Sequence, residues 1–179
     1  MRAAVCLSGL SGPFSDKGDV IPGISNSKNI CENVIDINSA DVFIHSWNDD
    51  KELISKYEEI YNPKISLFEK QINFGSNHSA KSRWYSHKKV LELKKKYEKE
   101  NSFEYDYVLV SRFDVTYFKP FIFSSLEKDY FYAGDWGSRD ISQGLEDSWF
   151  LSNSKIADEY ADLYDFMDEY IKKEKVCAE

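Results

Sequence analysis

Charged side chains stand directly behind an apolar run in the middle of the chain. Three β-forming residues, 108–110, are followed by Arg112 and Asp114. A short, uninterrupted apolar run is typical of a strand that is buried on both faces of a parallel sheet. Ligands of open α/β sheets bind just beyond the carboxyl ends of such strands. The pattern therefore predicts a ligand site at Arg112 and Asp114. The alternative is that the two side chains pair with each other and close a turn.

Two adjacent acids, Glu146 and Asp147, precede a second short apolar segment, 148–151. A polar stretch with two glycines, 135–146, leads into them and is predicted to be a loop. Carboxylates at the mouth of a buried segment suit a general base, because burial or a neighbouring like charge raises a carboxyl pKa into a useful range. Solvated acids at the boundary between a loop and a strand are the alternative.

The first strand, predicted over 2–10, ends in Ser8 and Gly9, and Gly12 follows shortly after. A glycine at the end of a strand lets the backbone approach a ligand closely. The segment is neither a P-loop nor a G-x-G-x-x-G dinucleotide fingerprint, because it lacks both spacings. An ordinary turn at the end of a strand is the alternative.

His45 and Arg83 are the other candidates. His45 lies near the carboxyl end of a strand predicted over 41–47, where a histidine satisfied within the core is the favoured interpretation. Arg83 stands with Ser82 and His87 near the start of a helix predicted over 81–99. Basic side chains at a helix N-terminus can bind phosphate, although a basic run is more often a solvated face.

The remaining patterns supply the elements that must position these residues. Strands and helices alternate along the chain, which predicts an α/β fold with a mostly parallel, Rossmann-like sheet flanked by helices. We expect a single domain over 1–179. Further strands are predicted over 65–68, 129–134 and 148–151, helices over 27–37, 53–60 and 156–175, and an extended edge segment over 115–123.

Composition excludes several classes of protein. The 23 basic and 31 acidic residues give a net charge of −8, which argues against a nucleic-acid binder. The three cysteines are widely spaced and form no CxxC pair, so reduced thiols and a cytoplasmic location are predicted. No signal peptide and no apolar stretch of about 20 residues is found, which predicts no transmembrane segment and leaves peripheral membrane association open. Abundant aromatic residues fit either a ring-rich core or stacking on bases and sugars.

Four segments in this order resemble a family of small bacterial and viral sugar transferases with a glycosyltransferase A-type fold, often found at capsule or surface-polysaccharide loci. The segments are 3–9 (AAVCLSG), 41–47 (DVFIHSW), 84–94 (WYSHKKVLELK) and 105–114 (YDYVLVSRFD). Together they span nearly the whole chain, and their order and spacing carry the resemblance.

The resemblance implies a nucleotide-sugar donor bound over the first strand and a saccharide or lipid-linked acceptor. Ser8 and Gly9 would meet the nucleotide, and Arg112 and Asp114 would meet the diphosphate. Asp147, with Glu146, would hold the position from which inverting members draw their base. Arg83 would help to stabilise the departing nucleoside diphosphate.

The chain departs from the commonest family pattern at 112–114. Metal-dependent members hold Mn²⁺ or Mg²⁺ with an Asp-x-Asp motif, whereas here the segment is Arg-Phe-Asp. A single carboxylate holds such a cation only where waters and donor phosphates complete the octahedron, in which case Asp114 is the expected ligand. Arg112 is the alternative source of positive charge for the diphosphate. The single carboxylate also keeps open a non-catalytic nucleotide- or glycan-binding module. A nucleotidyltransferase is disfavoured, because the first loop has no lysine among its glycines.

Overall fold

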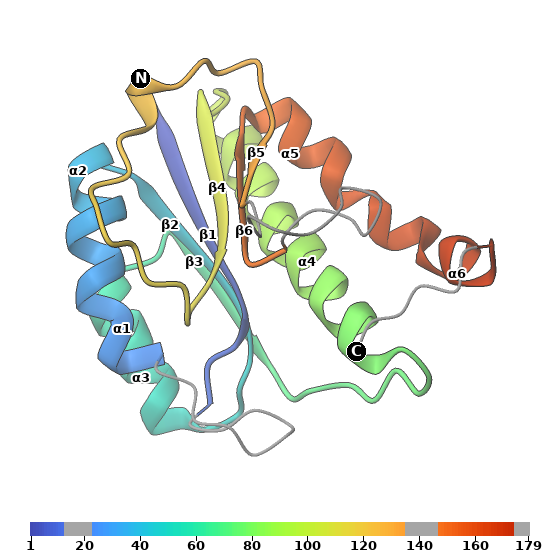
Figure 1. Ribbon diagram of the computed structural model, residues 1–179. Helices are drawn as coiled ribbons and strands as arrows, with labels where there is room; N and C mark the ends of the chain where they lie inside the picture. The colour runs from blue at the N-terminus through green and yellow to red at the C-terminus, as the bar shows by residue number, and fades with distance from the viewer. Residues whose placement is uncertain (13–22, 135–146, 174–179) are drawn as a thin grey trace.

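The computed structural model describes residues 1–12, 23–134 and 147–173 of the chain. Within these residues six strands form one sheet in the order β3–β2–β1–β4–β6–β5 (Figure 1). Strands β3, β2, β1 and β4 run parallel, while β6 is antiparallel to β4 and β5 is antiparallel to β6. The mostly parallel sheet is therefore confirmed. The strands are β1 (Ala3–Leu10), β2 (Asp41–Trp47), β3 (Ile65–Glu69), β4 (Tyr107–Arg112), β5 (Tyr132–Ala133) and β6 (Trp149–Ser152).

Helices cover both faces of the sheet, with α1 to α3 on one side and α4 to α6 on the other (Figure 1). Successive residues of β1 enter two separate hydrophobic clusters. Leu7 packs with Val34 and Tyr57 in one cluster, and Cys6 packs with Val90 in the other. A strand with helices on both sides must be apolar at every position, and this is why the run at 3–7 contains no polar residue.

The first helical stretch begins four residues earlier than the predicted helix over 27–37. It consists of α1 (Gly23–Ile30), a π-helical turn (Cys31–Ile35) and α2 (Asp36–Asn38). A Cβ atom on Gly23 would lie 1.9 Å from the Tyr57 hydroxyl oxygen. The absence of a side chain at Gly23 thus permits close packing of the helix start against Tyr57.

The next helix, α3 (Lys51–Tyr61), is capped by Asp50 and contains the helix predicted over 53–60. Asp50 Oδ1 accepts hydrogen bonds from the backbone N–H groups of Glu52 and Leu53, at 2.9 and 3.2 Å. These bonds satisfy two of the donors that a helix start leaves unpaired. At the other end, Asn62 adopts a left-handed conformation with φ 43° and stops the helix before Pro63.

The helix α4 (His78–Asn101) starts three residues before its predicted beginning at Lys81. Arg83 and His87 therefore lie beyond its first turn. The influence of the helix dipole is confined to that turn, so the expectation that Arg83 stands at the helix start is wrong, while its role toward a phosphate stays a prediction. Lys94 is fully buried in the middle of this helix, although charged residues almost never are.

The segment 115–123, predicted to be an extended edge segment, forms no strand in the described structure. Asparagine side chains of the first helical stretch hold its backbone instead. Asn29 Nδ2 donates to Tyr117 O (3.0 Å) and Asn29 Oδ1 accepts from Tyr117 N (2.8 Å). Asn38 bonds Phe121 O and Phe123 N in the same manner, at 2.8 and 2.9 Å. The side-chain amides replace a neighbouring strand, so these backbone groups are satisfied without a sheet partner.

The C-terminal region also departs from prediction. Instead of one helix over 156–175 the described residues form α5 (Ser154–Ala161) and α6 (Leu163–Lys173). Asn153 Oδ1 caps α5 by accepting from Ile156 N (2.9 Å), and Asp165 N donates to Asp162 O (3.0 Å) between the two helices. The strand predicted over 129–134 is reduced to the two residues of β5.

Two further expectations concern thiols and membranes. Cys6 is buried, Cys31 is partly buried, and neither forms a disulfide. Burial raises the pKa of the Cys6 thiol, which keeps it protonated and unreactive. Cys177 lies outside the described residues. In the part of the chain that the structure describes, no helix combines the length and apolar character needed to cross a bilayer.

Candidate active site

Polar side chains gather where the parallel strands end, at the lower edge of the sheet in Figure 1. In the strand register, Ser8 of β1 lies between His45 of β2 and Arg112 of β4. Asp114 follows β4, while Asp147 precedes β6, which is antiparallel to β4. Residues that leave one strand and enter its antiparallel neighbour meet at the same edge of a sheet. Both predicted carboxylates therefore lie at this edge, and Arg112 N donates to Ser148 O across it (3.1 Å).

The last residues of β1, 8–10, are held by side chains of neighbouring elements, and the positive-φ backbone at Gly9, within the end of this strand, is termed the Gly9 turn. Gly9 has φ +107°, and a Cβ atom there would meet no atom within 4 Å. The space is open, but the backbone conformation favours glycine over every other residue. Gly9 N donates to Ser86 Oγ (2.8 Å), and Ser46 Oγ donates to Gly9 O (2.8 Å). Ser8 Oγ is buried and has no hydrogen-bond partner among the described residues.

Arg112 and Asp114 form a two-point ion pair. Arg112 Nε donates to Asp114 Oδ1 (2.8 Å), and Arg112 Nη2 donates to Asp114 Oδ2. Asn26 of α1 binds the backbone on either side of Asp114. Its Nδ2 donates hydrogen bonds to Phe113 O (3.0 Å) and to Val115 O (2.7 Å). The pairing considered as an alternative thus occurs, and it lies at the carboxyl edge of the sheet. It fixes the planar guanidinium, which matches the geometry of carboxylates and phosphates.

Arg83 of α4 forms an ion pair with Asp147. The two side chains are 33% and 39% exposed, so solvent reaches the pair. This contact links the helix above the sheet to the loop that enters β6, and it brings a second guanidinium to the edge. Glu146, the other predicted base, lies outside the described residues.

His87, one helical turn after Arg83, is buried beneath the arginines. Its ring packs against Phe150 with centroids 6.0 Å apart, and its Nδ1 has no hydrogen-bond partner among the described residues. Burial, reinforced by the nearby charges of Arg83 and Arg112, lowers the pKa of His87 to about 3. The imidazole is therefore neutral at physiological pH.

We expect His87 to make the protein sensitive to acid. In the unfolded chain it takes up a proton near pH 6.5, whereas in the folded protein it stays neutral down to about pH 3. The unfolded state then binds more protons, so the free energy of unfolding falls by about 1.4 kcal/mol per pH unit below pH 6.5. From pH 7 to pH 5, the free energy of unfolding of His87→Leu should fall by about 2 kcal/mol less than that of the parent protein. Denaturant titrations at both pH values measure this difference.

Phe150→Leu is the control for that comparison, because it alters the same packing cluster without removing a titrating group. The free energy of unfolding of Phe150→Leu should depend on pH as that of the parent protein does. An equal loss of stability in the parent and in His87→Leu would show that His87 is not buried in its neutral form.

His45 is a satisfied core residue, as predicted. It is fully buried, its Nδ1 lies 2.7 Å from Ser86 Oγ, and its Nε2 lies 2.9 Å from Glu69 Oε2. Burial lowers the pKa of His45, and the hydrogen bond to Glu69 opposes that shift. Trp47 stacks on Tyr85 nearby, with centroids 5.0 Å apart, so part of the aromatic content lies close to this edge.

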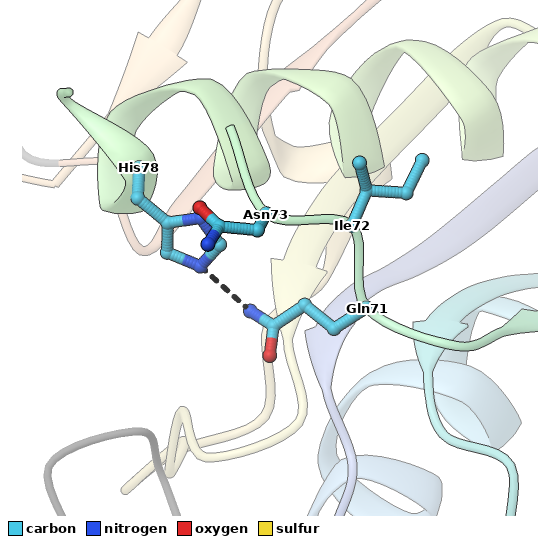
Figure 2. A pocket seen from close by; sticks show the side chains of 4 residues that line it. All are labelled: Gln71, Ile72, Asn73 and His78. Atoms are coloured by element: carbon cyan, nitrogen blue, oxygen red, sulfur yellow. Dashed lines mark hydrogen bonds between the residues drawn. The ribbon is translucent and has the colours of Figure 1, made fainter. Parts of the chain in front are cut away.

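An open hollow of about 310 Å³ lies beside these rings, between the end of β3 and the start of α4. Gln71, Ile72, Asn73 and His78 line it. Figure 2 shows the Gln71 amide and the His78 imidazole pointing toward one another, and their Nε2 atoms are 3.2 Å apart. Amide and imidazole groups of this kind suit hydrogen bonds to sugar hydroxyls or to a base edge.

The described residues do not form a metal site of their own. They contain no group of three or more His, Cys, Asp or Glu side chains placed to hold an ion. Both carboxylate oxygens of Asp114 accept hydrogen bonds from Arg112, and Asp147 is paired with Arg83. Mg²⁺ and Mn²⁺ prefer several oxygen ligands, so the side chains around Asp114 fit a fixed arginine charge better than a cation. The role of Asp114 as a metal ligand stays a prediction.

Sequence reasoning missed three residues that shape this edge, namely Asn26, Glu69 and Ser86. The pattern does place Ser86 on the inward stripe of the helix predicted over 81–99, where a serine among apolar residues is a signal of a buried hydroxyl. Asn26 and Glu69 carry no such signal, because their partners lie 87 and 24 positions away along the chain.

Comparison with known proteins finds similarity in structure but none in sequence families. No protein-family model and no curated protein sequence matches the chain. Among solved structures, it is similar to the apo-form glycosyltransferase GlyE of Streptococcus pneumoniae TIGR4, with a TM-score of 0.54 and 15% sequence identity. The alignment covers 99% of this chain but 40% of that one, so the chain spans less than half the length of GlyE.

A likeness at this identity shows the fold and no more. The α/β class predicted from the sequence, with a glycosyltransferase-like sheet flanked by helices, is confirmed. Ser8, Gly9, Arg83, Arg112, Asp114 and Asp147 lie at the carboxyl edge of the parallel strands, and their roles stay predictions.

Proposed function

We propose that the protein is a glycosyltransferase that moves a sugar from a nucleotide-sugar donor to a saccharide or lipid-linked acceptor. One observation supports this most. Arg83 and Arg112, from a helix and a strand, both lie near His87 at the carboxyl edge of a glycosyltransferase-like sheet, each paired with an aspartate. A nucleoside diphosphate is the anion that such a pair of cations suits.

In the proposed complex the nucleotide lies over the Gly9 turn and the diphosphate faces Arg112. Gly9 has no side chain to keep the ligand away, and the open space above it supports a close approach. Asp114 orients the Arg112 guanidinium, which then exchanges carboxylate oxygens for phosphate oxygens as the donor arrives. The Ser8 hydroxyl, buried beside Arg112 in the register, supplies a further polar atom at the same position.

Asp147 is the proposed general base. It accepts the proton of an acceptor hydroxyl, whose oxygen forms a bond to the anomeric carbon of the donor sugar. The bond from that carbon to the diphosphate breaks, and the nucleoside diphosphate leaves with the bonding electrons. Arg83 holds Asp147 in place before the reaction, and both arginines stabilise the negative charge of the leaving group.

The biological setting belongs to the same proposal. The resemblance to capsule-type transferases supports a role in surface-polysaccharide synthesis in the cytoplasm, with the acceptor presented at a membrane. The hollow lined by Gln71 and His78 offers hydrogen-bonding groups for a sugar close to this edge.

A non-catalytic nucleotide- or glycan-binding module is the second candidate. One observation favours it: Asp114 and Asp147, the described carboxylates with proposed roles, are already engaged by arginines. Such a module would bind a donor and never hydrolyse it, whereas a transferase slowly transfers its sugar to water when no acceptor is present.

Arg112→Gln tests the donor site. We expect it to weaken nucleotide-sugar binding by roughly 10- to 100-fold, because it removes charge-assisted hydrogen bonds to the diphosphate. Calorimetry against a panel of nucleotide sugars, with and without Mn²⁺, measures the affinity, and chromatography of the released nucleotide measures slow hydrolysis. Donor binding without hydrolysis would favour the module.

Arg2→Gln is the matched control, since Arg2 stacks on Phe103 (4.2 Å to the ring centroid) at the opposite end of the sheet. It should bind the donor as the parent does. Native affinity in Arg112→Gln, or no affinity of the parent for any donor, would contradict the proposed function.

A further inference from the structure

The Gly9 turn is connected to a chain of side chains from three other elements. Gly9 N donates to Ser86 Oγ of α4 (2.8 Å), Ser86 Oγ lies 2.7 Å from His45 Nδ1 of β2, and His45 Nε2 lies 2.9 Å from Glu69 Oε2 of β3. Ser86 and His45 are fully buried, while the Glu69 side chain is 32% exposed. The chain thus runs from a carboxylate in contact with solvent to the backbone of the turn.

Chemistry fixes the direction of every hydrogen bond in this chain. The Glu69 carboxylate can only accept, so His45 Nε2 carries a hydrogen and donates it. The other nitrogen of a neutral imidazole has a lone pair, so His45 Nδ1 accepts the Ser86 hydroxyl proton. A lone pair of Ser86 Oγ is then left for the Gly9 N–H. A neutral His45 therefore satisfies all three contacts at once.

Serine, histidine and a carboxylate in one chain also occur in hydrolases, where the serine is the nucleophile. That role does not fit here, because Ser86 has no exposed surface for a substrate to reach. Its oxygen also already accepts the Gly9 N–H. The functional end of this hydrogen-bonded series of side chains is therefore the Gly9 turn.

We propose that His45, Ser86 and Glu69 are positioning residues for donor binding, and that they hold the Gly9 turn in the left-handed conformation on which the nucleotide rests. This inference depends on the proposed function, which places the nucleotide over Gly9. None of the three side chains touches the reacting atoms. They act through Gly9, whose N–H would otherwise be buried without an acceptor.

The chain makes donor binding depend on the protonation of His45. Four titratable or charged groups among the described residues face or influence His45: Glu69 from β3, and Tyr85, Lys89 and Glu92 from α4. A proton on Nδ1 would point at the Ser86 hydroxyl, which must then turn away, toward the more distant His45 O (3.4 Å). Ser86 Oγ would then accept from two N–H groups, one of them on a cation, and their mutual repulsion would weaken the bond to Gly9 and loosen the turn.

Amide exchange tests the chain without any ligand. In Ser86→Ala the Gly9 amide should exchange with solvent about tenfold faster or more, because it loses its acceptor. Ser86→Thr keeps the hydroxyl and should restore slow exchange. Ser82→Ala removes another buried serine of α4 and should leave Gly9 unchanged. Equal exchange of Gly9 in Ser86→Ala and the parent would overturn the proposal.

Binding of UDP, GDP and ADP tests the consequence for the donor. Ser86→Ala should weaken the tightest of these by about tenfold, and should raise KM for the matching nucleotide sugar while kcat stays unchanged. A loss of folded protein would instead lower the apparent kcat and leave KM the same. If no nucleoside diphosphate binds the parent, the proposed function fails; if one binds equally to Ser86→Ala, only the positioning role fails.

Glu69→Gln tests the pH dependence of nucleotide binding, which a change in packing alone would not shift. The carboxylate favours protonated His45, so its removal should shift the weakening of nucleotide binding in acid to lower pH. Glu58→Gln, which removes an equal charge from α3, should leave the profile in place. The same pH profile in the parent and in Glu69→Gln would refute the link between His45 and the turn.

Discussion

Asp147→Asn should lower sugar transfer by roughly 100- to 10,000-fold while leaving donor affinity close to that of the parent. Asparagine keeps the shape of the side chain and a hydrogen-bond acceptor for Arg83, but it cannot take the proton of the acceptor hydroxyl. The donor contacts assigned to Gly9 and Arg112 are untouched. The rate of nucleotide release with acceptor present measures transfer, and calorimetry measures donor affinity.

Asp165→Asn provides the control. Asp165 lies on α6 and bonds Lys88 of α4 (2.6 Å), so this change also removes an exposed aspartate bridged to α4. Transfer should remain at the parent rate. Transfer at the parent rate in Asp147→Asn would exclude Asp147 as the base. A loss that appears only in donor affinity would assign Asp147 to binding.

Lys94→Met should lower the free energy of unfolding by about 3–5 kcal/mol. Lys94 Nζ donates to Glu98 Oε2 (2.9 Å), Ser154 Oγ (2.6 Å) and Asp158 Oδ1 (2.7 Å), and its side chain has no exposed surface. Removing the ammonium leaves the Glu98 carboxylate buried without its cation. A buried charge without a partner costs far more than a methionine side chain gains by packing.

Lys95→Met is the matched control for Lys94. Lys95 pairs with the same Asp158 (3.2 Å), but its side chain is 66% exposed. Solvent screens that pair, so Lys95→Met should cost less than about 1 kcal/mol. Urea titration of both variants makes the comparison. Adding Glu98→Gln to Lys94→Met should recover much of the loss, and equal stability of the two single variants would show that Lys94 is not buried among carboxylates.

The Lys94 cluster has a structural role far from the proposed chemistry. It joins α4 to α5, and Glu98 Oε1 also accepts the backbone N–H of Tyr105 (2.7 Å), just before β4. The strand that carries Arg112 is thus anchored at its start by buried charges and at its end by Asn26. We expect changes at Lys94 to act on stability before they act on donor binding.

Local patterns were enough to predict most of the framework. The apolar runs at 3–7, 42–44 and 108–110 are strands because only a strand between two layers of helices buries every position. Asp50 and Pro63 bracket α3 through interactions within one helical turn. The position of Arg112 and Asp114 at the carboxyl edge follows from the same rule, since a strand that is identified correctly also fixes where its end lies.

Other features were decided only by the tertiary structure. The asparagine contacts replace a strand over 115–123, and they join residues 83 to 88 positions apart. Lys94 stands next to Lys95 in a basic run of the sequence, and its burial becomes evident only where α5 brings Ser154 and Asp158 against it. His45 reads as an isolated core histidine until β3 and α4 supply its two partners.

Residues close together along the chain were sufficient to predict the parallel sheet, the helices that cover it and the edge where a ligand would bind. Backbone conformation and the burial of strands depend on neighbours a few residues apart, and such neighbours can be read along the chain. The tertiary structure alone decided which arginine meets which carboxylate and what holds the Gly9 turn. Those contacts depend on distances in space between segments that the sequence keeps far apart.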